Sequence, residues 1–138
     1  MNRDSDCIFC KILDGKLPST VIDEDERTVA IMDVNPATRG HALVIPRSHS
    51  RDLLEIDADD LSAVTAAAQR LAGAVKERLR ADGVNLINSC GQRAWQTVFH
   101  FHLHVIPRYE GDSMRLPWTP APGDPLEIAA AAQEIQGL

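Results

Sequence analysis

The chain has 138 residues, 44% of them hydrophobic and 25% charged, which is typical of one globular domain. Its 14 basic and 20 acidic residues give a net charge of −6, which argues against nucleic-acid binding because that needs a basic surface. No apolar run approaches the roughly 20 residues that span a membrane, and residues 1–6 lack a signal-peptide core. We expect one cytoplasmic domain over residues 1–138, with neither nucleic-acid nor membrane partners.

The first third of the chain predicts a short helix followed by strands. Residues 7–14 are expected to form the helix, and the strands are expected at 20–22, 28–32 and 41–45. Residues 33–36 predict a turn, because proline fixes its own φ and restricts the residue before it.

A long amphipathic helix dominates the middle of the chain. Its apolar residues step by three and four, as one helix face requires; they are Leu61, Val64, Ala68, Leu71, Val75 and Leu79. Asp57 is the expected N-cap and Gly83 the expected residue just past the C-terminus. Strands at 84–87 and 99–107 and a last helix at 126–136 complete the prediction. The fold class is therefore α+β, with a mostly antiparallel five-stranded sheet, one long helix and short terminal helices.

Cys7 and Cys10 form a Cys-x-x-Cys pair near the N-terminus. In a cytoplasmic chain this spacing indicates a zinc knuckle, a redox pair or free thiols, but not a structural disulfide. A second such pair is absent from the sequence, so zinc would need histidines to complete its ligands. Cys90 stands alone and is expected to be an unliganded thiol.

Three histidines, His100, His102 and His104, occupy every second position of the last predicted strand. Alternating residues of a strand share a face, so the three imidazoles are expected on one side. The apolar residues between and beside them are expected on the buried side: Phe99, Phe101, Leu103 and Val105. Three readings are open: a strand with satisfied histidines, a His-x-His metal site, and an imidazole that attacks phosphorus as a nucleophile.

Four blocks of sequence occur in an order that resembles one family. They are CIFCKI at 7–12, DVNP at 33–36, GHALVIPRSH at 40–49 and QTVFHFHLHV at 96–105. Together they resemble the histidine triad (HIT) superfamily of nucleotide hydrolases and transferases. The resemblance covers about residues 7–108 and leaves a C-terminal tail at 109–138.

The resemblance implies a nucleotide hydrolase that cleaves at the α-phosphate of a purine nucleotide conjugate, either a phosphoramidate or a dinucleoside polyphosphate. His102 is then the nucleophile that forms a covalent nucleotidyl-histidine. His104 is expected to bind phosphate oxygens, and Thr97 to help the leaving group. The remaining roles are Gln96 and Asn88 near the phosphate, Asp33 on the ribose and His41 supporting the triad from behind.

The opening block resembles the bacterial members that hold zinc. By position, the implied ligands of a structural Zn²⁺ are Cys7, Cys10, His49 and His100. The resemblance also implies a homodimer. Two other functions remain open: a nucleotide-binding or scaffold protein with weak catalysis, and a transferase or phosphorylase that passes the nucleotidyl group to phosphate.

Some residues depart from the family pattern. Trp95 stands directly before Gln96, where a glycine is expected, and either narrows the approach to the phosphate or shapes a leaving-group pocket. Arg93 is either a cation for a polyphosphate or a solvated charge. Trp118 is either a surface residue or a group that reaches a partner's active site. Residues 105–112 resemble the dinucleoside polyphosphate branch more than the phosphoramidase branch.

Overall fold

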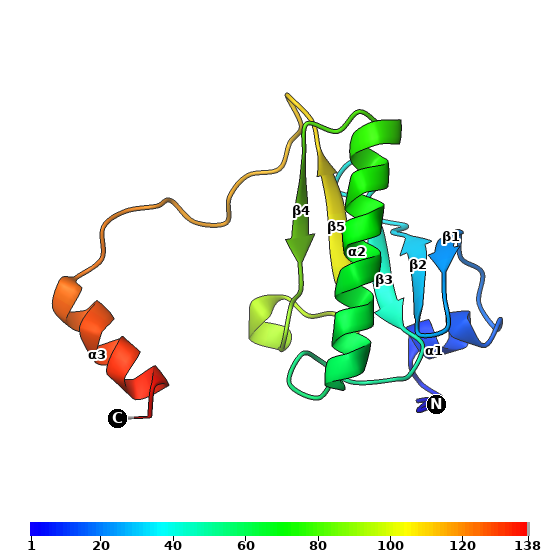
Figure 1. Ribbon diagram of the computed structural model, residues 1–138, viewed down its shortest axis with the longest axis horizontal. Helices are drawn as coiled ribbons and strands as arrows, with labels where there is room; N and C mark the ends of the chain where they lie inside the picture. The colour runs from blue at the N-terminus through cyan, green and yellow to red at the C-terminus, as the bar shows by residue number, and fades with distance from the viewer. Residues whose placement is uncertain (138) are drawn as a thin grey trace.

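An antiparallel sheet in the order β1-β2-β3-β5-β4 forms the frame of the molecule. The computed structural model describes residues 1–137 (Figure 1). The strands are β1 (Val21–Glu24), β2 (Thr28–Met32), β3 (Ala42–Pro46), β4 (Gly83–Ile87) and β5 (Leu103–Arg108). The helices are α1 (Ile8–Leu13), α2 (Ala58–Arg78) and α3 (Pro125–Ile135), with a 3-10 turn η1 (Gln92–Ala94). The predicted α+β class and five-stranded sheet are confirmed.

Helix α2 packs along one face of the sheet, as Figure 1 shows. Its buried face meets alternate residues of β2, β3 and β5 in the larger hydrophobic core; that core includes Val64, Ala68, Leu71, Ala30, Val44, Phe101 and Val105. Asp57 is the N-cap, as predicted, and its carboxylate accepts hydrogen bonds from the backbone N–H groups of Asp59 and Asp60.

The end of α2 differs from the prediction. The helix stops at Arg78 with Leu79 as its C-cap, and Arg80 takes the left-handed conformation, with φ of 57°. Gly83 was expected to fill this role, but it is the first residue of β4. The turn is therefore tighter than expected, and a non-glycine residue adopts a conformation that glycine adopts at lower cost.

Helix α1 covers the opposite face of the sheet. Cys7, Phe9 and Cys10 pack there against the residues of β2 and β3 that face away from α2; these are Val29, Ile31, Leu43 and Ile45. Because side chains alternate along each strand, they contribute to two cores, one under α1 and one under α2. His104 pairs with Leu43 in the sheet, so its side chain lies on the α1 face.

The last strand is shorter than the prediction of 99–107. Strand β5 begins at Leu103, so His100 and His102 precede it in irregular backbone. The N–H of Phe101 donates to the carbonyl of Ser50 at 2.7 Å instead of to a neighbouring strand. Phe101, Leu103 and Val105 are buried as expected, but Phe99 is 36% exposed, with the Arg51 guanidinium 4.8 Å from its ring centroid.

The C-terminal segment leaves the sheet after β5 and ends in α3, well separated from the body in Figure 1. Within residues 1–137, every side chain of α3 is exposed, including those of Leu126 and Ile128. Helix α3 starts at Pro125 after the N-cap Asp124, close to its predicted bounds. None of the helices in the described residues is long and apolar enough to cross a membrane.

Candidate active site and metal centre

A cavity of about 410 Å³ opens between α1 and the sheet face that α1 covers. Polar groups line part of its wall: Asp33, His41, Thr97, His102 and His104. Apolar side chains line much of the remainder, and they include Ile8, Phe9, Ile12, Pro18, Ile31, Leu43 and Val98. Such a mixture of an apolar surface and a few convergent polar groups is typical of small-molecule sites.

His102 lies in this cavity wall with one nitrogen fixed by the backbone. Its Nδ1–H donates to the carbonyl oxygen of His100 at 2.8 Å. A neutral imidazole carries one proton, so Nε2 holds a lone pair, and no group among residues 1–137 is hydrogen-bonded to that atom. Burial lowers the pKa of His102, although this hydrogen bond and the charge of Asp33 act in the opposite direction. The ring is therefore neutral near pH 7 and keeps its lone pair.

His104 has the opposite tautomer, which a chain of hydrogen bonds sets. The backbone N–H of Ala37 donates to His41 Nδ1 at 2.9 Å, so the proton of His41 resides on Nε2. His41 Nε2 lies 2.9 Å from Nδ1 of His104 and donates to it. The proton of His104 is then on Nε2, where it is available to a ligand in the cavity.

Asp33 completes this cluster. One of its oxygens lies 3.4 Å from His41 Nε2 and 4.0 Å from His104 Nδ1. Burial lowers the pKa of His41, partly offset by the Asp33 charge. Burial, followed by the nearby His102 and His41, lowers the pKa of His104 to about 4. The cluster therefore presents neutral rings and one carboxylate to the cavity at pH 7.

Two residues expected near the phosphate hold the backbone of the site. Asn88 Nδ2 donates to the carbonyl of His102 at 3.0 Å, and its Oδ1 is buried without a partner in the described residues. Gln96 is 4% exposed, and both of its amide hydrogens donate to backbone carbonyls, those of Arg51 and Val98. Phosphate contact by Gln96 stays a prediction, and it requires one of these hydrogen bonds to break.

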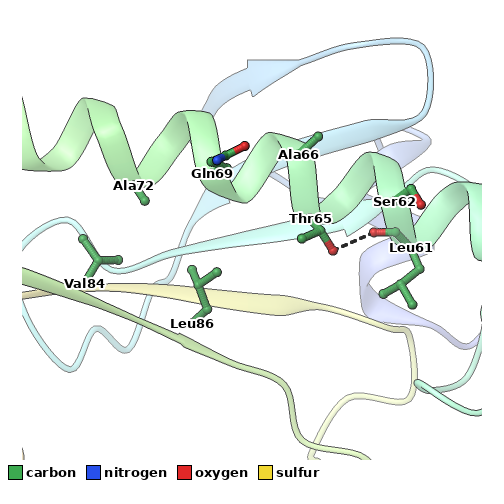
Figure 2. A pocket seen from close by; sticks show the side chains of 8 residues that line it. All are labelled: Leu61, Ser62, Thr65, Ala66, Gln69, Ala72, Val84 and Leu86. Carbon is green, nitrogen blue, oxygen red and sulfur yellow. Dashed lines mark hydrogen bonds between the residues drawn. The ribbon is translucent and has the colours of Figure 1, made fainter.

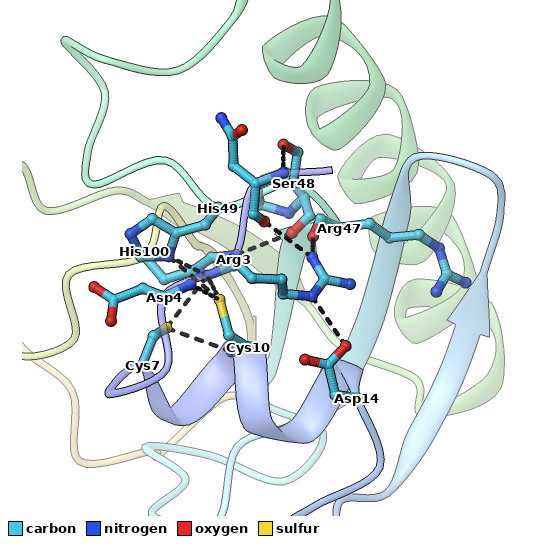
Figure 3. A network of polar contacts seen from close by, with 11 residues as sticks. Arg3, Asp4, Cys7, Cys10, Asp14, Arg47, Ser48, His49 and His100 are labelled. Carbon is cyan, nitrogen blue, oxygen red and sulfur yellow. Dashed lines mark hydrogen bonds and ion pairs between the residues drawn. The ribbon is translucent and has the colours of Figure 1, made fainter.

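The four residues implied as zinc ligands converge on the other side of His100 (Figure 3). Nδ1 of His100 lies 3.4 Å from Cys7 Sγ, 3.6 Å from Cys10 Sγ and 3.2 Å from His49 Nδ1. Cys10 Sγ is also 3.4 Å from His49 Nδ1. Two sulfurs and two imidazole nitrogens thus face one point.

These separations fit a tetrahedral zinc ion. Zn–N bonds near 2.0 Å and Zn–S bonds near 2.3 Å place two nitrogens about 3.3 Å apart, and a nitrogen and a sulfur about 3.5 Å apart. His100 donates its Nε2–H to the carbonyl of Pro46 at 2.9 Å, so the lone pair on Nδ1 faces the sulfurs. Burial raises the pKa of the Cys7 thiol, so a cation is needed to keep it as a thiolate. The cluster can hold zinc.

Polar contacts outside the four ligands support the cluster, as Figure 3 shows. The backbone N–H of Asp4 donates to Cys10 Sγ at 3.4 Å. Arg3 pairs with Asp14 at 3.0 Å and also donates to the carbonyl of Arg47. The N-terminal segment is thereby tied to the loop that carries His49.

The residues that depart from the family pattern lie outside the cavity wall. Trp95 is 69% exposed, and its φ of 75° is in the left-handed region, which explains why a glycine suits this position. Arg93 is exposed in η1, and Trp118 is 63% exposed in the C-terminal segment. None of these three is among the residues that line the cavity.

The apolar wall of the cavity was not predicted from the sequence. Ile8, Phe9 and Ile12 contribute to it from α1, and Phe9 also contacts the rings of both His100 and His102 edge-on. The available signal was the helical spacing of these residues around the Cys-x-x-Cys pair, because Ile12 lies four residues after Ile8 and three after Phe9, and residues three and four apart are neighbours on a helix face.

Comparison with known proteins agrees with this geometry. The model of the HIT domain matches residues 14–111. "Protein hit" of Bacillus subtilis is 38% identical over 119 residues, covering 86% of this chain and 82% of that protein. A zinc-bound histidine triad family protein from Mycobacterium smegmatis is 41% identical, with a TM-score of 0.77 over 96% of this chain and 98% of that one.

The chain is also similar to a solved structure whose name states that the protein binds nucleotides. The histidine triad nucleotide-binding protein from Candida albicans is 28% identical, with a TM-score of 0.84 over 95% of each chain. The match to the family model spans well over half of the 138 residues, and the fold agrees across these structures. The chain described here belongs to the HIT domain family.

Proposed function

We propose that this protein is a nucleotide hydrolase that cleaves at the α-phosphate of a purine nucleotide conjugate through a covalent intermediate on His102. One observation carries the proposal: Nδ1 of His102 is tied to the His100 carbonyl, so its Nε2 lone pair is free beside the cavity. A neutral imidazole held in one tautomer is a nucleophile ready to attack phosphorus. The conjugate is either a phosphoramidate or a dinucleoside polyphosphate.

The walls of the cavity suggest how the nucleotide lies. The purine base would rest against the apolar wall near Phe9 and Ile31. Asp33 would accept hydrogen bonds from ribose hydroxyls. The α-phosphate would then lie beside His102 and His104, with Thr97 near the leaving group. Asn88 and Gln96 would support the phosphate end of the site through their hydrogen bonds to the carbonyls of His102 and Arg51.

The reaction proceeds in two displacements. Nε2 of His102 attacks the α-phosphorus, an N–P bond forms, and the bond from phosphorus to the leaving oxygen or nitrogen breaks. A leaving amine takes its proton from solvent by relay through the hydroxyl of Thr97, which lines the cavity and is left unchanged, whereas a leaving polyphosphate departs as the anion. Water then attacks phosphorus and loses a proton to solvent, the N–P bond breaks, and the nucleoside monophosphate leaves neutral His102 with its proton still on Nδ1. His104 Nε2–H stabilises negative charge on the phosphate oxygens in both steps.

The proposed cofactor is one structural Zn²⁺ on Cys7, Cys10, His49 and His100. The support is the fit of the distances to tetrahedral zinc, together with the zinc-bound relative from Mycobacterium smegmatis. Four protein ligands leave no open position, so zinc would stabilise the fold and would not bind substrate. Thiol ligands also suit a reducing cytoplasm, where we propose that the protein works.

We propose a homodimer that uses the groove between α2 and β4. Figure 2 shows this groove, which Leu61, Ala72, Val84 and Leu86 line together with four further residues. Strand β4 lies at an edge of the sheet and Leu86 is 45% exposed, so apolar surface and unpaired backbone are both available to a second copy. A two-fold axis beside β4 would bury the same patch on each chain.

Two alternatives remain distinct from this proposal. A nucleotide-binding or scaffold protein would retain nucleotide and turn it over weakly without needing His102. A phosphorylase would transfer the nucleotidyl group to phosphate, so its product would form only when phosphate is present. The net charge of −6 favours a small nucleotide over a nucleic acid as the ligand.

The test is turnover of two probes, an adenosine phosphoramidate and a diadenosine polyphosphate, by the purified protein and by His102→Ala. The proposal predicts cleavage of at least one probe and its near-total loss in the variant, with nucleotide binding and thermal unfolding retained. Equal turnover by both proteins would exclude His102 as the nucleophile. Binding of nucleotide without cleavage would favour the binding-protein alternative.

A further inference from the structure

His100 belongs to the metal centre through its side chain and to the active site through its backbone. The imidazole is fully buried, with Nδ1 facing both cysteine sulfurs and His49. The carbonyl oxygen of the same residue accepts the Nδ1–H of His102 at 2.8 Å. The group that fixes the tautomer of His102 is therefore the backbone carbonyl of an implied metal ligand.

Strand pairing does not fix that carbonyl. Strand β5 begins only at Leu103, and its pairs with β3 start at the Leu103–Val44 pair. The preceding backbone is held by Phe101 N–H, which donates to the carbonyl of Ser50, and by His100 Nε2–H, which donates to the carbonyl of Pro46. Ser50 directly follows His49, another residue of the metal cluster. Metal ligation at His100 would therefore fix this irregular segment, and ligation at His49 would fix the loop to which Phe101 is hydrogen-bonded.

Phe9 provides a second connection between the two sites. It lies between Cys7 and Cys10 on α1, a helix of only six residues, which is too short to be stable by itself. Its ring meets His100 edge-on at 5.8 Å and His102 edge-on at 5.2 Å between centroids. Ligation of the cysteines at either side of Phe9 would hold this ring against the nucleophile.

We propose that the metal centre positions the nucleophile. His100 and Phe9 are positioning residues, and through them the tautomer and orientation of the His102 ring depend on metal occupancy. This inference rests on the proposed function and deepens it, because it gives the metal a role in turnover without any contact with substrate. With metal bound, His102 is held with its proton on Nδ1 and its lone pair toward the cavity. Without metal, the His100 carbonyl shifts and the ring populates both tautomers.

His104 supplies an internal comparison. Its tautomer is set by His41 and Ala37, and neither residue contacts the metal cluster. Loss of metal therefore changes the tautomer of His102 and leaves that of His104 unchanged, even though the two ring centroids are 5.1 Å apart. Disturbing the groups behind a functional ligand commonly costs about 10- to 100-fold in activity, and we expect a loss of kcat in that range with a smaller change in KM.

The experiment compares histidine ¹⁵N chemical shifts, which report which ring nitrogen carries the proton, at about pH 8, where an ordinary histidine is neutral. The samples are the zinc-loaded protein, the protein after chelation, and Cys7→Ser. Cys7 is the N-cap of α1 and its Sγ accepts from the Cys10 N–H; serine keeps a good cap while removing a thiolate ligand. Cys90→Ser, outside both sites, is the matched control.

The expected result is one His102 tautomer in the zinc-loaded and Cys90→Ser proteins, and a mixture after chelation or in Cys7→Ser, with the tautomer of His104 the same throughout. An unchanged His102 tautomer and kcat in a folded, metal-free protein would overturn the inference. If metal-free protein unfolds, cadmium-loaded protein takes its place: the larger ion should displace the His102 signals, and unchanged signals there would equally overturn it.

Turnover of the two nucleotide probes by the zinc-loaded protein is measured in parallel. Cleavage that depends on His102, without any effect of metal on its tautomer, would refute the inference while the proposed function stands. Absence of cleavage by the zinc-loaded protein would refute the proposed function, and the tautomer comparison would still decide the inference.

Discussion

His41 and His104 are joined by a hydrogen bond of 2.9 Å from the Nε2–H of the first to Nδ1 of the second. The backbone N–H of Ala37 donates to Nδ1 of His41, so the proton of neutral His41 lies on Nε2. His104 consequently presents a donor to the cavity, whereas His102, tied to a carbonyl, presents a lone pair. Two histidines that are two residues apart thus offer opposite hydrogen-bonding groups to one cavity.

The first prediction concerns the donor on His104. His104→Ala should lower kcat by about 10²- to 10³-fold, because it removes a hydrogen bond to an oxygen that gains charge in the transition state. His104→Gln should recover part of that loss, since its amide also carries N–H donors. Steady-state kinetics with both variants makes the comparison, and equal kcat in wild type and His104→Ala would show that this donor is not used.

The pH dependence of turnover follows from the state of His102. The nucleophile acts only when Nε2 is unprotonated, and burial lowers the pKa of this ring below the ordinary value of 6.5. Activity should therefore fall on the acid side with a midpoint below 6.5, the ordinary pKa of a histidine. A profile of kcat/KM against pH measures this, and an acid limb with its midpoint above 6.5 would contradict it.

The proposed zinc can be tested through composition and stability. Protein purified without chelator should contain about one zinc per chain, and chelation should lower the free energy of unfolding by several kcal/mol, because binding to a structural site contributes directly to folding. Elemental analysis and thermal unfolding give both values. Full thermal stability in a protein that carries no metal would rule out the site.

The proposed dimer depends on the groove between α2 and β4. Leu86→Asp should dissociate it, because a carboxylate would be buried in an apolar contact without a partner. Ile22→Asp is the matched control, since Ile22 is 43% exposed on β1, the opposite edge strand, and Leu86 is 45% exposed on β4. Sedimentation of the three proteins separates the outcomes, and a monomeric wild type would refute the proposal.

The spacing of apolar residues predicted most of the helices and strands. The three-and-four spacing of Val64, Ala68 and Leu71 located the buried face of α2, and Asp57 marked its start. Such patterns are local, and each records which side of one element is buried. The C-terminal end of α2 was mislocated, because a left-handed Arg80 leaves no glycine in the sequence to mark it.

The backbone around the three histidines, residues 99–104, was not predicted correctly from local patterns. Alternation predicted a strand from residue 99, but His100 turns toward Cys7 and Cys10, and Phe101 donates to Ser50 instead of a strand. These partners lie at least 50 residues away along the chain, so no pattern within the segment encodes them. Family resemblance supplied the ligand set and the catalytic roles, and the hydrogen bonds that fix each ring appeared only in the folded structure.

The central claim is that His102 carries the nucleotide during turnover. Its most direct measurement is rapid acid-free quenching of the enzyme with an adenosine phosphoramidate or a diadenosine polyphosphate, followed by mass spectrometry of the peptides that contain residues 96–108. We predict an added nucleoside monophosphate on His102, formed before product accumulates and absent from His102→Ala. Turnover with no adduct on this peptide, or an adduct that persists in His102→Ala, would contradict the account.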